Sequence, residues 1–220
     1  MKILLVIPSI DGRITCETFR SLWGAARDPG LLLETRALVW NQDVVRVRNR
    51  AAYEFLRSDA DVLWFVDADV GFEPDVPRAM LASGLSFVAA AYPKKKIRWG
   101  EPRERMLEWT FQAVPESKPE VVAGRPFQEC TLVPMGCTMI RQEIVQLVAS
   151  SVESYVDTYD GEDHEVPDCF GHLTVGRAKL PEDYSFCVRA RKLGARAWTL
   201  LDPICTHTGG YTFNAREIGR

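Results

Sequence analysis

The sequence predicts an α/β protein with a mostly parallel central sheet, and three observations support this. Short apolar runs typical of buried strands alternate with helical segments through the first half of the 220-residue chain. One of these runs, Asp61–Val66, ends in two carboxylates, Asp67 and Asp69, separated by one residue. The second half loses the regular alternation and is α+β in character. We therefore expect one compact domain over residues 1–220 with a smaller antiparallel portion.

Four strands and three helices are predicted in the first half. The apolar run Lys2–Ile7, closed by Pro8 and Ser9, is typical of a first buried strand. After it we expect a helix over Cys16–Ala26, a strand over Leu31–Val39, a helix over Asp43–Leu56, a strand over Asp61–Val66, a short helix over Pro77–Ser83 and a strand over Ser86–Tyr92. In an open parallel sheet, ligands bind beyond the carboxyl ends of the strands. Asp67 and Asp69 are therefore expected at the edge of a binding crevice.

The second half is predicted to begin with antiparallel strands and loops over Met106–Val133. Cys137–Ile140 then leads into a helix over Gln142–Val148. The best-marked helix is Pro181–Gly194, with proline in its first turn, basic residues near its end and glycine at its stop. Its residues Phe186, Ala190 and Leu193 fall at helical spacing and should face the core.

Composition and charge exclude several classes of protein. Hydrophobic residues make up 46% and charged residues 26%, as in ordinary globular domains, and no apolar run approaches the roughly 18 residues of a membrane span. The net charge of −3 gives no global basic field of the kind that nonspecific nucleic-acid binders use. The first apolar run is too short for a signal peptide, so a cytoplasmic location is expected. The six cysteines have no framework spacing, which favours reduced thiols.

The acidic pair suggests a metal site. Two hard oxygen donors at a crevice edge suit Mg²⁺ or Mn²⁺ bridged to a diphosphate. Two Asp residues after a strand also make ordinary turns and helix caps, so the pair by itself leaves both interpretations open. The later residue His207, in a Thr- and Gly-rich loop, can add an imidazole ligand. Glu182 and Asp183 lie at a helix amino end, near a loop. Acidic residues at a helix amino end are also stabilising on dipole grounds alone.

Taken in order, these segments resemble the GT-A glycosyltransferases. The likeness is carried by Pro8-Ser9 after the first strand, Arg48-Asn49 within a helix, Asp67-Ala68-Asp69 (a DxD motif), Met135-Gly136, Glu182-Asp183 and His207, and it spans the chain from Ile7 to His207. It is strongest to short single-domain, family-2-like forms from phages, large DNA viruses and bacteria. The resemblance implies a Rossmann-like sheet, with residues 1–92 binding a nucleotide sugar and residues 93–220 facing the acceptor. For a viral chain the cytoplasm would be that of the host.

The resemblance also implies roles for individual residues on the donor side. Pro8 and Ser9 would seat the nucleotide base, Arg48 and Asn49 would lie near base or phosphates, and Lys94 would reach a phosphate. Met135 and Gly136 would form a turn beneath the sugar, where a missing side chain allows close approach. Asp67 would face the ribose or the metal, Asp69 would bind Mn²⁺ or Mg²⁺ directly, and His207 would complete the metal shell.

On the acceptor side, Asp183 resembles the carboxylate that takes the proton from the attacking hydroxyl in inverting members, with Glu182 as its neighbour. The implied activity is transfer of a sugar, from a UDP-sugar most readily, to a hydroxyl. The acceptor is either a glycan or a hydroxymethylated pyrimidine in phage-type DNA. Lys94–Arg105 contains six basic residues, two acidic residues and Trp99, a composition that is compatible with binding DNA phosphates and stacking on a base. The alternative interpretation is a lid over the donor diphosphate. Asp157–Asp168 is expected to be a mobile loop near the acceptor.

Two other functions remain open. A nucleotidyltransferase acting on a sugar phosphate can share the sheet and the acidic metal site, but its usual Gly-rich, basic signature after the first strand is absent from IPSIDGR. A non-catalytic nucleotide-sugar-binding module is disfavoured by the presence of Asp67, Asp69, Asp183 and His207. A P-loop NTPase, a dinucleotide-binding oxidoreductase and a serine hydrolase are excluded because the chain lacks their glycine and nucleophile motifs.

Overall fold

The computed structural model describes residues 1–39, 43–102, 106–203, 205–210 and 212–214. Arg103–Arg105 of the basic segment lie outside the described residues. Helices occupy α1 Cys16–Ala26, α2 Val44–Leu56, α3 Val76–Ala82, α4 Gln142–Ala149 and α5 Glu182–Lys192. Each helix begins and ends within about two residues of its predicted bounds.

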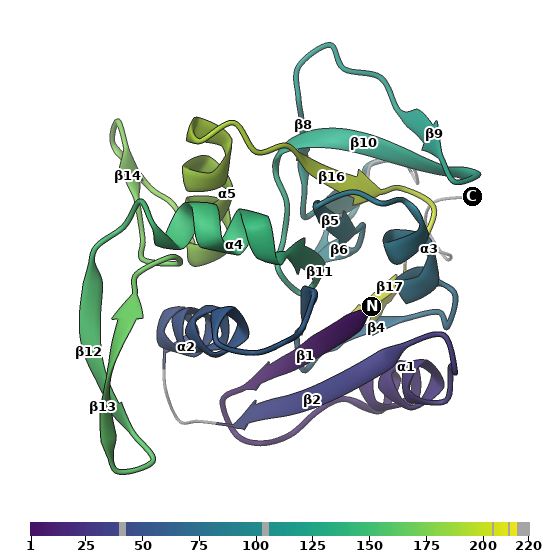
Figure 1. Ribbon diagram of the computed structural model, residues 1–220. Helices are drawn as coiled ribbons and strands as arrows, with labels where there is room; N and C mark the ends of the chain where they lie inside the picture. The colour runs from purple at the N-terminus through teal and green to yellow at the C-terminus, as the bar shows by residue number, and fades with distance from the viewer. Residues whose placement is uncertain (40–42, 103–105, 204, 211, 215–220) are drawn as a thin grey trace.

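A nine-stranded sheet forms the centre of the molecule (Figure 1). Its strands, in spatial order, are β2 Leu32–Val39, β1 Lys2–Ser9, β3 Val62–Val66, β11 Cys137–Arg141, β5 Phe87–Ala90, β16 Ala197–Leu200, β10 Arg125–Leu132 and β8 Gln112–Ala113, with β9 Glu120–Val122 also paired to β10. Strands β2, β1 and β3 run parallel, as do β5 and β16, whereas β11 runs antiparallel to both of its neighbours. Strands β10, β8 and β9 are antiparallel. The α/β class, the mostly parallel sheet and the antiparallel portion are confirmed.

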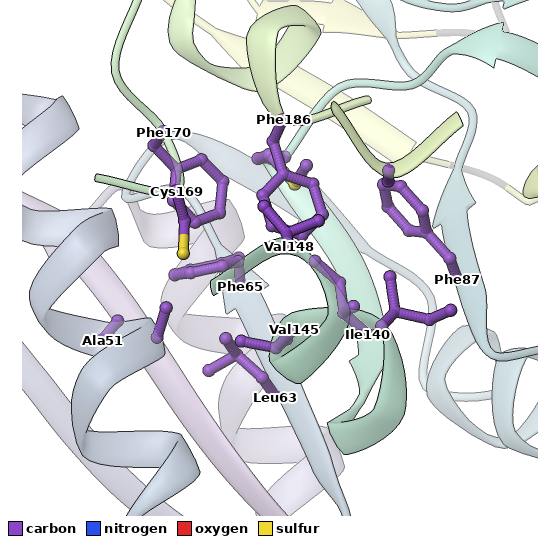
Figure 2. Close-up of a cluster of buried hydrophobic side chains, with 14 of the residues drawn as sticks. Ala51, Leu63, Phe65, Phe87, Ile140, Val145, Val148, Cys169, Phe170 and Phe186 are labelled. Carbon is purple, nitrogen blue, oxygen red and sulfur yellow. The ribbon is translucent and has the colours of Figure 1, made fainter. Parts of the chain in front are cut away.

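Each face of the sheet carries its own hydrophobic core, because successive strand residues point to opposite faces. On β3, Leu63 and Phe65 belong to one core, and Trp64 belongs to the other. The first core packs against α2, α4 and α5, and Figure 2 shows its side chains. In this core Phe186 of α5 stacks on Phe170 at a ring-centroid distance of 4.6 Å. The second core is covered by α1 and α3.

Helix α5 follows its predicted pattern except at its end. Phe186 and Ala190 are buried as expected, but Leu193 is 39% exposed. Leu193 is the C-cap residue, and its backbone has left the helical conformation, with φ −93° and ψ 8°. A residue beyond the last helical turn no longer projects along the buried stripe. The helical spacing in the sequence therefore predicts one core residue too many.

The strand ends that position the site meet at one edge of the sheet. Strand β1 ends at Ser9 and β3 ends at Val66, immediately before Asp67. The antiparallel strand β11 begins at this same edge, since Cys137 pairs with Val66. The reversed strand therefore brings the turn before it, at Gly136, beside Asp67, and the two are joined by a hydrogen bond from the Asp67 N–H to the Gly136 carbonyl of 2.9 Å.

Four smaller sheets surround the central one. β4 Val70–Phe72 pairs with β17 Cys205–Thr208, which pairs with β18 Thr212–Asn214, so His207 lies opposite Val70. The other three are the antiparallel pairs β6 Pro93–Ile97 with β7 Leu107–Trp109, β12 Ser154–Tyr159 with β13 Glu162–Pro167, and β14 Thr174–Val175 with β15 Ala178–Lys179.

The prediction of a mobile loop over Asp157–Asp168 is wrong. This stretch is most of the hairpin β12–β13, turned by Asp160 and Gly161 with φ of 52° and 82°. Positive φ at both central residues is the geometry of a tight hairpin turn, for which Asp-Gly is a preferred sequence. The hairpin is fastened to α2 by a hydrogen bond of 2.7 Å from Arg46 Nε to the buried carboxylate of Asp157.

Among the described residues, no helix has both the length and the apolar character needed to cross a membrane.

Candidate active site

A pocket of about 590 Å³ opens at the edge where β1 and β3 end. Its walls come from the β1–α1 connection, the first turns of α2, the residues after β3 and the start of α5. Six of the residues singled out from the sequence line it: Pro8, Ser9, Arg48, Asp67, Asp69 and Glu182. The pocket therefore brings together segments that lie far apart in the sequence, from Pro8 near the start of the chain to Glu182.

Arg48 is the buried charge beneath this pocket. The residue is only 3% exposed, and its Nη2 donates to Asp67 Oδ1 across 2.9 Å while Nε lies 3.5 Å from Glu182 Oε1. Burial alone would lower the pKa of Arg48, but the carboxylates of Asp67, Glu182 and Asp183 outweigh burial and raise that pKa. Nε and Nη1 have no hydrogen-bond partner among the described residues, although both are buried. A buried guanidinium with unused donors is a strong anchor for an oxyanion ligand.

Asp67 is held on two sides by protein groups. Its backbone N–H donates to Gly136, and its side chain accepts from Arg48. Burial raises the pKa of Asp67, Arg48 opposes this, and the net shift is upward. The carboxylate remains partly open, since 28% of the side chain is accessible.

Asp69 lies between two nitrogen groups. Lys95 of β6 forms an ion pair with its Oδ2, and Nε2 of His207 lies 3.6 Å from its Oδ1. The Nδ1 of His207 is 2.8 Å from the Pro93 carbonyl oxygen, which can only accept, so Nδ1 carries the proton in this bond. Burial lowers the pKa of His207 despite that bond and the nearby Asp69. The imidazole is thus neutral near pH 7, and its Nε2 lone pair faces Asp69.

These groups fit a divalent cation only in part. A histidine whose Nδ1–H is held by a carbonyl presents Nε2 in the orientation that metal-binding histidines use, and Asp69 supplies a hard oxygen beside it. Asp67 is paired with Arg48 instead, and no cluster of three or more His, Cys, Asp or Glu side chains in the described part of the chain is arranged to hold a metal. A cation placed here would have Asp69 and His207 as ligands, with Asp67 as a third only through the oxygen that Arg48 leaves free, and would need further oxygens from a substrate, as Mg²⁺ sites on diphosphates commonly do.

Gly136 lies where two neighbouring side chains leave no room for a Cβ atom. A Cβ atom built at this position would come within 2.9 Å of both Asp67 Oδ2 and Tyr92 Cζ, and closer still to the Tyr92 hydroxyl. The Gly136 N–H donates to that hydroxyl across 3.0 Å. Only glycine leaves room here for Tyr92 and Asp67 together. Met135, expected beside it under the sugar, is instead 1% exposed in the core and takes no part in the pocket.

Asp183 lies in the first turn of α5, one residue beyond the pocket-lining Glu182. Burial raises the pKa of Asp183 to about 6, with the Glu182 carboxylate adding to the shift and Arg48 opposing it. The Tyr184 N–H donates to its Oδ1, and the Tyr184 hydroxyl donates to the Thr110 carbonyl across 2.9 Å. A partly buried carboxylate with a pKa near 6 is suited to accept a proton near neutral pH.

Two expected donor-binding residues lie elsewhere. Asn49 is fully buried, and its amide bonds Asp168 and the Phe170 N–H, each across 2.7 Å, so it fastens α2 to the segment after the hairpin. Adjacent helix residues point about 100° apart, and α2 lines the pocket with Val44, Val47 and Arg48, so Asn49 points away from it. Lys94 pairs with Glu108 at 3.3 Å, on the side of β6 that faces away from Asp69.

Lys95 is the site residue that sequence reasoning missed. Lys94, Lys96 and Arg98 all contact Glu108, whereas Lys95 contacts Asp69. This division follows the two-residue period of a strand. The signal was available in the sequence, because a strand assignment over KKKIR separates Lys95 from its two lysine neighbours.

Comparisons with known proteins support the fold. The chain aligns with the crystal structure of A197 from STIV with a TM-score of 0.57 and 18% identity, over 95% of this chain and 86% of that one. It also aligns with GalNAc-T7, crystallised with UDP, GalNAc and Mn²⁺, with a TM-score of 0.51 and 9% identity, over 94% of this chain but 43% of the other. No protein-family model and no curated protein matches the sequence.

These likenesses show a shared fold, and that fold is the GT-A fold expected from the sequence. The chain spans less than half the length of GalNAc-T7. The fold places a ligand-binding crevice where the pocket lies, beyond the carboxyl ends of β1 and β3.

Proposed function

We propose that the protein is a metal-dependent glycosyltransferase that moves a sugar from a nucleotide-sugar donor to an acceptor hydroxyl. The observation that carries the proposal is the pocket at the sheet edge, where buried Arg48, Asp67 and Asp69 lie together on a GT-A fold. In the proposed enzyme, residues 1–92 form most of the donor pocket and residues 93–220 form the acceptor side.

Arg48 is proposed to anchor the donor, with Pro8 and Ser9 forming the wall on which the base lies. The unused Nε and Nη1 donors of Arg48 suit a ribose or diphosphate oxygen. A UDP-sugar is the favoured donor, because GalNAc-T7, which shares the fold, was crystallised with UDP and GalNAc.

The proposed metal is Mn²⁺ or Mg²⁺, held by Asp69 and His207, with Asp67 completing the protein's share. When bound, such an ion neutralises charge developing on the departing nucleoside diphosphate. Mn²⁺ is present in the GalNAc-T7 structure. Lys95 holds one oxygen of Asp69 in the protein alone, so it has to release that oxygen or share it when the cation binds.

Asp183 is the proposed general base. It would accept the proton of the acceptor hydroxyl as the new glycosidic bond forms and the bond to the diphosphate breaks, which is the inverting course. Glu182 is less suited to this role, because it lies at the pocket wall within 3.5 Å of Arg48. Its carboxylate instead keeps Arg48 charged and raises the pKa of Asp183.

The acceptor is proposed to be a glycan in preference to hydroxymethylated DNA. Lys94, Lys96 and Arg98 share the single carboxylate of Glu108, so the segment offers less free positive charge than its sequence indicates. Duplex DNA binding through several phosphates would weaken steeply with salt, whereas binding of a neutral glycan would change little.

The proposal is tested by thermal shift with UDP-, GDP-, CMP- and dTDP-sugars and with nucleoside triphosphates, each with Mn²⁺, with Mg²⁺ and with chelator. Ligands that bind only the folded state raise its melting temperature. We expect a metal-dependent shift with UDP-sugars that Asp69→Ala abolishes. Asp59→Ala, which changes an exposed carboxylate at the far end of the sheet, should leave the shift intact. A shift with nucleoside triphosphates and none with any nucleotide sugar would replace the proposal with a nucleotidyltransferase.

A further inference from the structure

The outward face of helix α1 has an unusual composition for a solvated surface. The residues that α1 buries are Thr18, Ser21 and Ala25, which are small or polar. Its exposed residues are Cys16, Phe19, Arg20, Trp23, Ala26 and Arg27. The helix therefore directs its two large aromatic side chains into solvent, the reverse of the pattern by which surface helices usually pack.

The two exposed aromatic side chains contact each other, and further exposed apolar residues precede them in the chain. Phe19 is 54% exposed, Trp23 is 58% exposed, and their rings stack with centroids 6.2 Å apart and planes 23° apart. Thr15 caps the helix, so Ile14 and Phe19 occupy the two positions that pack together in a hydrophobic staple. Ile14 is itself 40% exposed, and Ile10 in the preceding loop is 69% exposed. Exposed aromatic and aliphatic side chains gathered in one place mark an interaction surface.

Exposed basic residues outnumber exposed acidic ones over residues 10–27, with Arg13, Arg20 and Arg27 against Asp11. Arg20 and Arg27 lie beside the aromatic pair, and within the described part of the chain neither makes an ion pair. The helix has a single acidic residue, Glu17, which is half-buried on the side where α1 meets Gly71 of β4. Aromatic side chains flanked by an excess of arginines suit the interface of an anionic membrane, where rings enter the headgroup region and guanidinium groups pair with phosphates.

We propose that the α1 face, consisting of Ile10, Ile14, Phe19, Arg20, Trp23 and Arg27, binds peripherally to anionic lipid membranes. The patch is continuous with the donor pocket, since Ile10 and Ile14 also line the pocket wall. Membrane contact through α1 places the pocket opening beside the lipid headgroups. This inference stands on the exposed face alone and does not depend on which reaction the pocket carries out.

Vesicle flotation tests the proposal with two compositions, phosphatidylcholine alone and phosphatidylcholine with phosphatidylglycerol. We expect the intact protein to float with the anionic vesicles and much less with the neutral ones. Phe19→Ala combined with Trp23→Ala should weaken anionic-vesicle binding at least about tenfold, because two partly inserted rings are lost. Arg20→Glu combined with Arg27→Glu should remove the preference for anionic lipid.

Matched controls come from the opposite half of the chain. Trp99→Ala removes a tryptophan that is 80% exposed, and Arg177→Glu reverses an exposed arginine. Both should bind vesicles as the intact protein does. Melting temperatures report folding, and since Phe19 and Trp23 are exposed, their double variant should keep its melting temperature.

Four results would overturn the proposal. One is the absence of binding to anionic vesicles, and another is binding that survives the Phe19 and Trp23 substitutions. The third is a dimer, detected by light scattering, that those substitutions convert to a monomer while no vesicle binding is seen, which would assign the face to a second copy of this chain. Duplex DNA binding lost in the Arg20 and Arg27 variant, with no vesicle binding, would count against lipid in the same way.

Discussion

Arg48 Nη2 lies 2.9 Å from Asp67 Oδ1 and joins the first turns of α2 to the residue that follows β3. The same guanidinium contacts Glu182 at the start of α5. One buried cation thus holds together three segments that are distant in the sequence, and each contributes a carboxylate or a donor group to the pocket.

Replacing Arg48 should therefore damage both stability and donor binding. Arg48→Ala leaves the Asp67 and Glu182 carboxylates without their shared cation, and breaking a buried ion pair costs about 3 to 5 kcal/mol. Urea unfolding measures this loss, and calorimetry measures UDP-sugar binding. Arg78→Ala is the matched control, since its ion pair with Asp28 is at the surface, where ion pairs contribute little to stability. Equal costs for the two variants would contradict a central role for Arg48.

Asp183→Asn should abolish sugar transfer and leave donor affinity within a few-fold of that of the intact protein. The amide keeps the size of the side chain but cannot accept the acceptor proton, and a group used only in the transition state changes kcat. Stability should rise. The folded state holds the pKa near 6, above the ordinary 3.8, so the ionised carboxylate opposes folding above pH 6. Its removal should add up to about 3 kcal/mol at pH 8 and little below pH 4. Loss of donor binding together with transfer would indicate a structural role.

Transfer should depend on pH through Asp183. Burial raises the pKa of Asp183 most, and the charged groups that adjust this pKa are Glu182 on the same helix, Arg48 on α2 and Asp67 after β3. Because the ionised form is the base, kcat should rise with pH and level off above about 6. Arg48→Lys, which keeps the charge but loses the fixed geometry, should move this midpoint. A kcat that falls as the pH rises through 6 would rule out Asp183 as the base.

Gly136→Ala should displace Asp67 and Tyr92. The added methyl group would lie 2.9 Å from Asp67 Oδ2, so the neighbours must move, at a cost of about 1 to 3 kcal/mol and with loss of donor affinity. Combining it with Tyr92→Phe removes the nearest oxygen but leaves the ring, so recovery should be partial. Gly210→Ala is the control, because a Cβ atom there meets nothing within 4 Å. Donor affinity and unfolding free energy both report the outcome.

Lys95→Ala should strengthen binding of Mn²⁺ in the absence of donor. The ammonium group occupies one oxygen of Asp69, and a cation must compete with it for that oxygen. We expect a several-fold gain in Mn²⁺ affinity by calorimetry or by the electron spin resonance of free Mn²⁺. Lys94→Ala removes a neighbouring lysine that pairs with Glu108 and should have no effect. Unchanged Mn²⁺ affinity in Lys95→Ala would place the metal away from Asp69.

The sequence allowed the helices, most strands and the position of the acidic pair to be predicted, because each depends on local periodicity and strand ends. The sequence did not reveal which way individual side chains point. Arg48 and Asn49 are adjacent in the sequence, yet one faces the pocket and the other faces the hairpin. A motif of two neighbouring residues does not tell which of the two points into the site.

The antiparallel strand β11 could not be predicted either. Nothing in Cys137–Arg141 distinguishes it from a parallel strand, since its direction is set by pairing with β3 and β5. The hairpin β12–β13 was missed for the opposite reason, because its acidic composition masked a local Asp-Gly turn signal.

The placement of β16 has a consequence for how the chain folds. This strand comes near the end of the sequence, yet it lies between β5 and β10, pairing with β5 in parallel and β10 in antiparallel orientation. Until residues 197–200 have left the ribosome, β5 and β10 each present an unpaired edge, and unpaired edges promote aggregation. Completion of the sheet is thus a late, long-range event, and we expect the central sheet to gain full protection from hydrogen exchange only after α5 and β16 are in place.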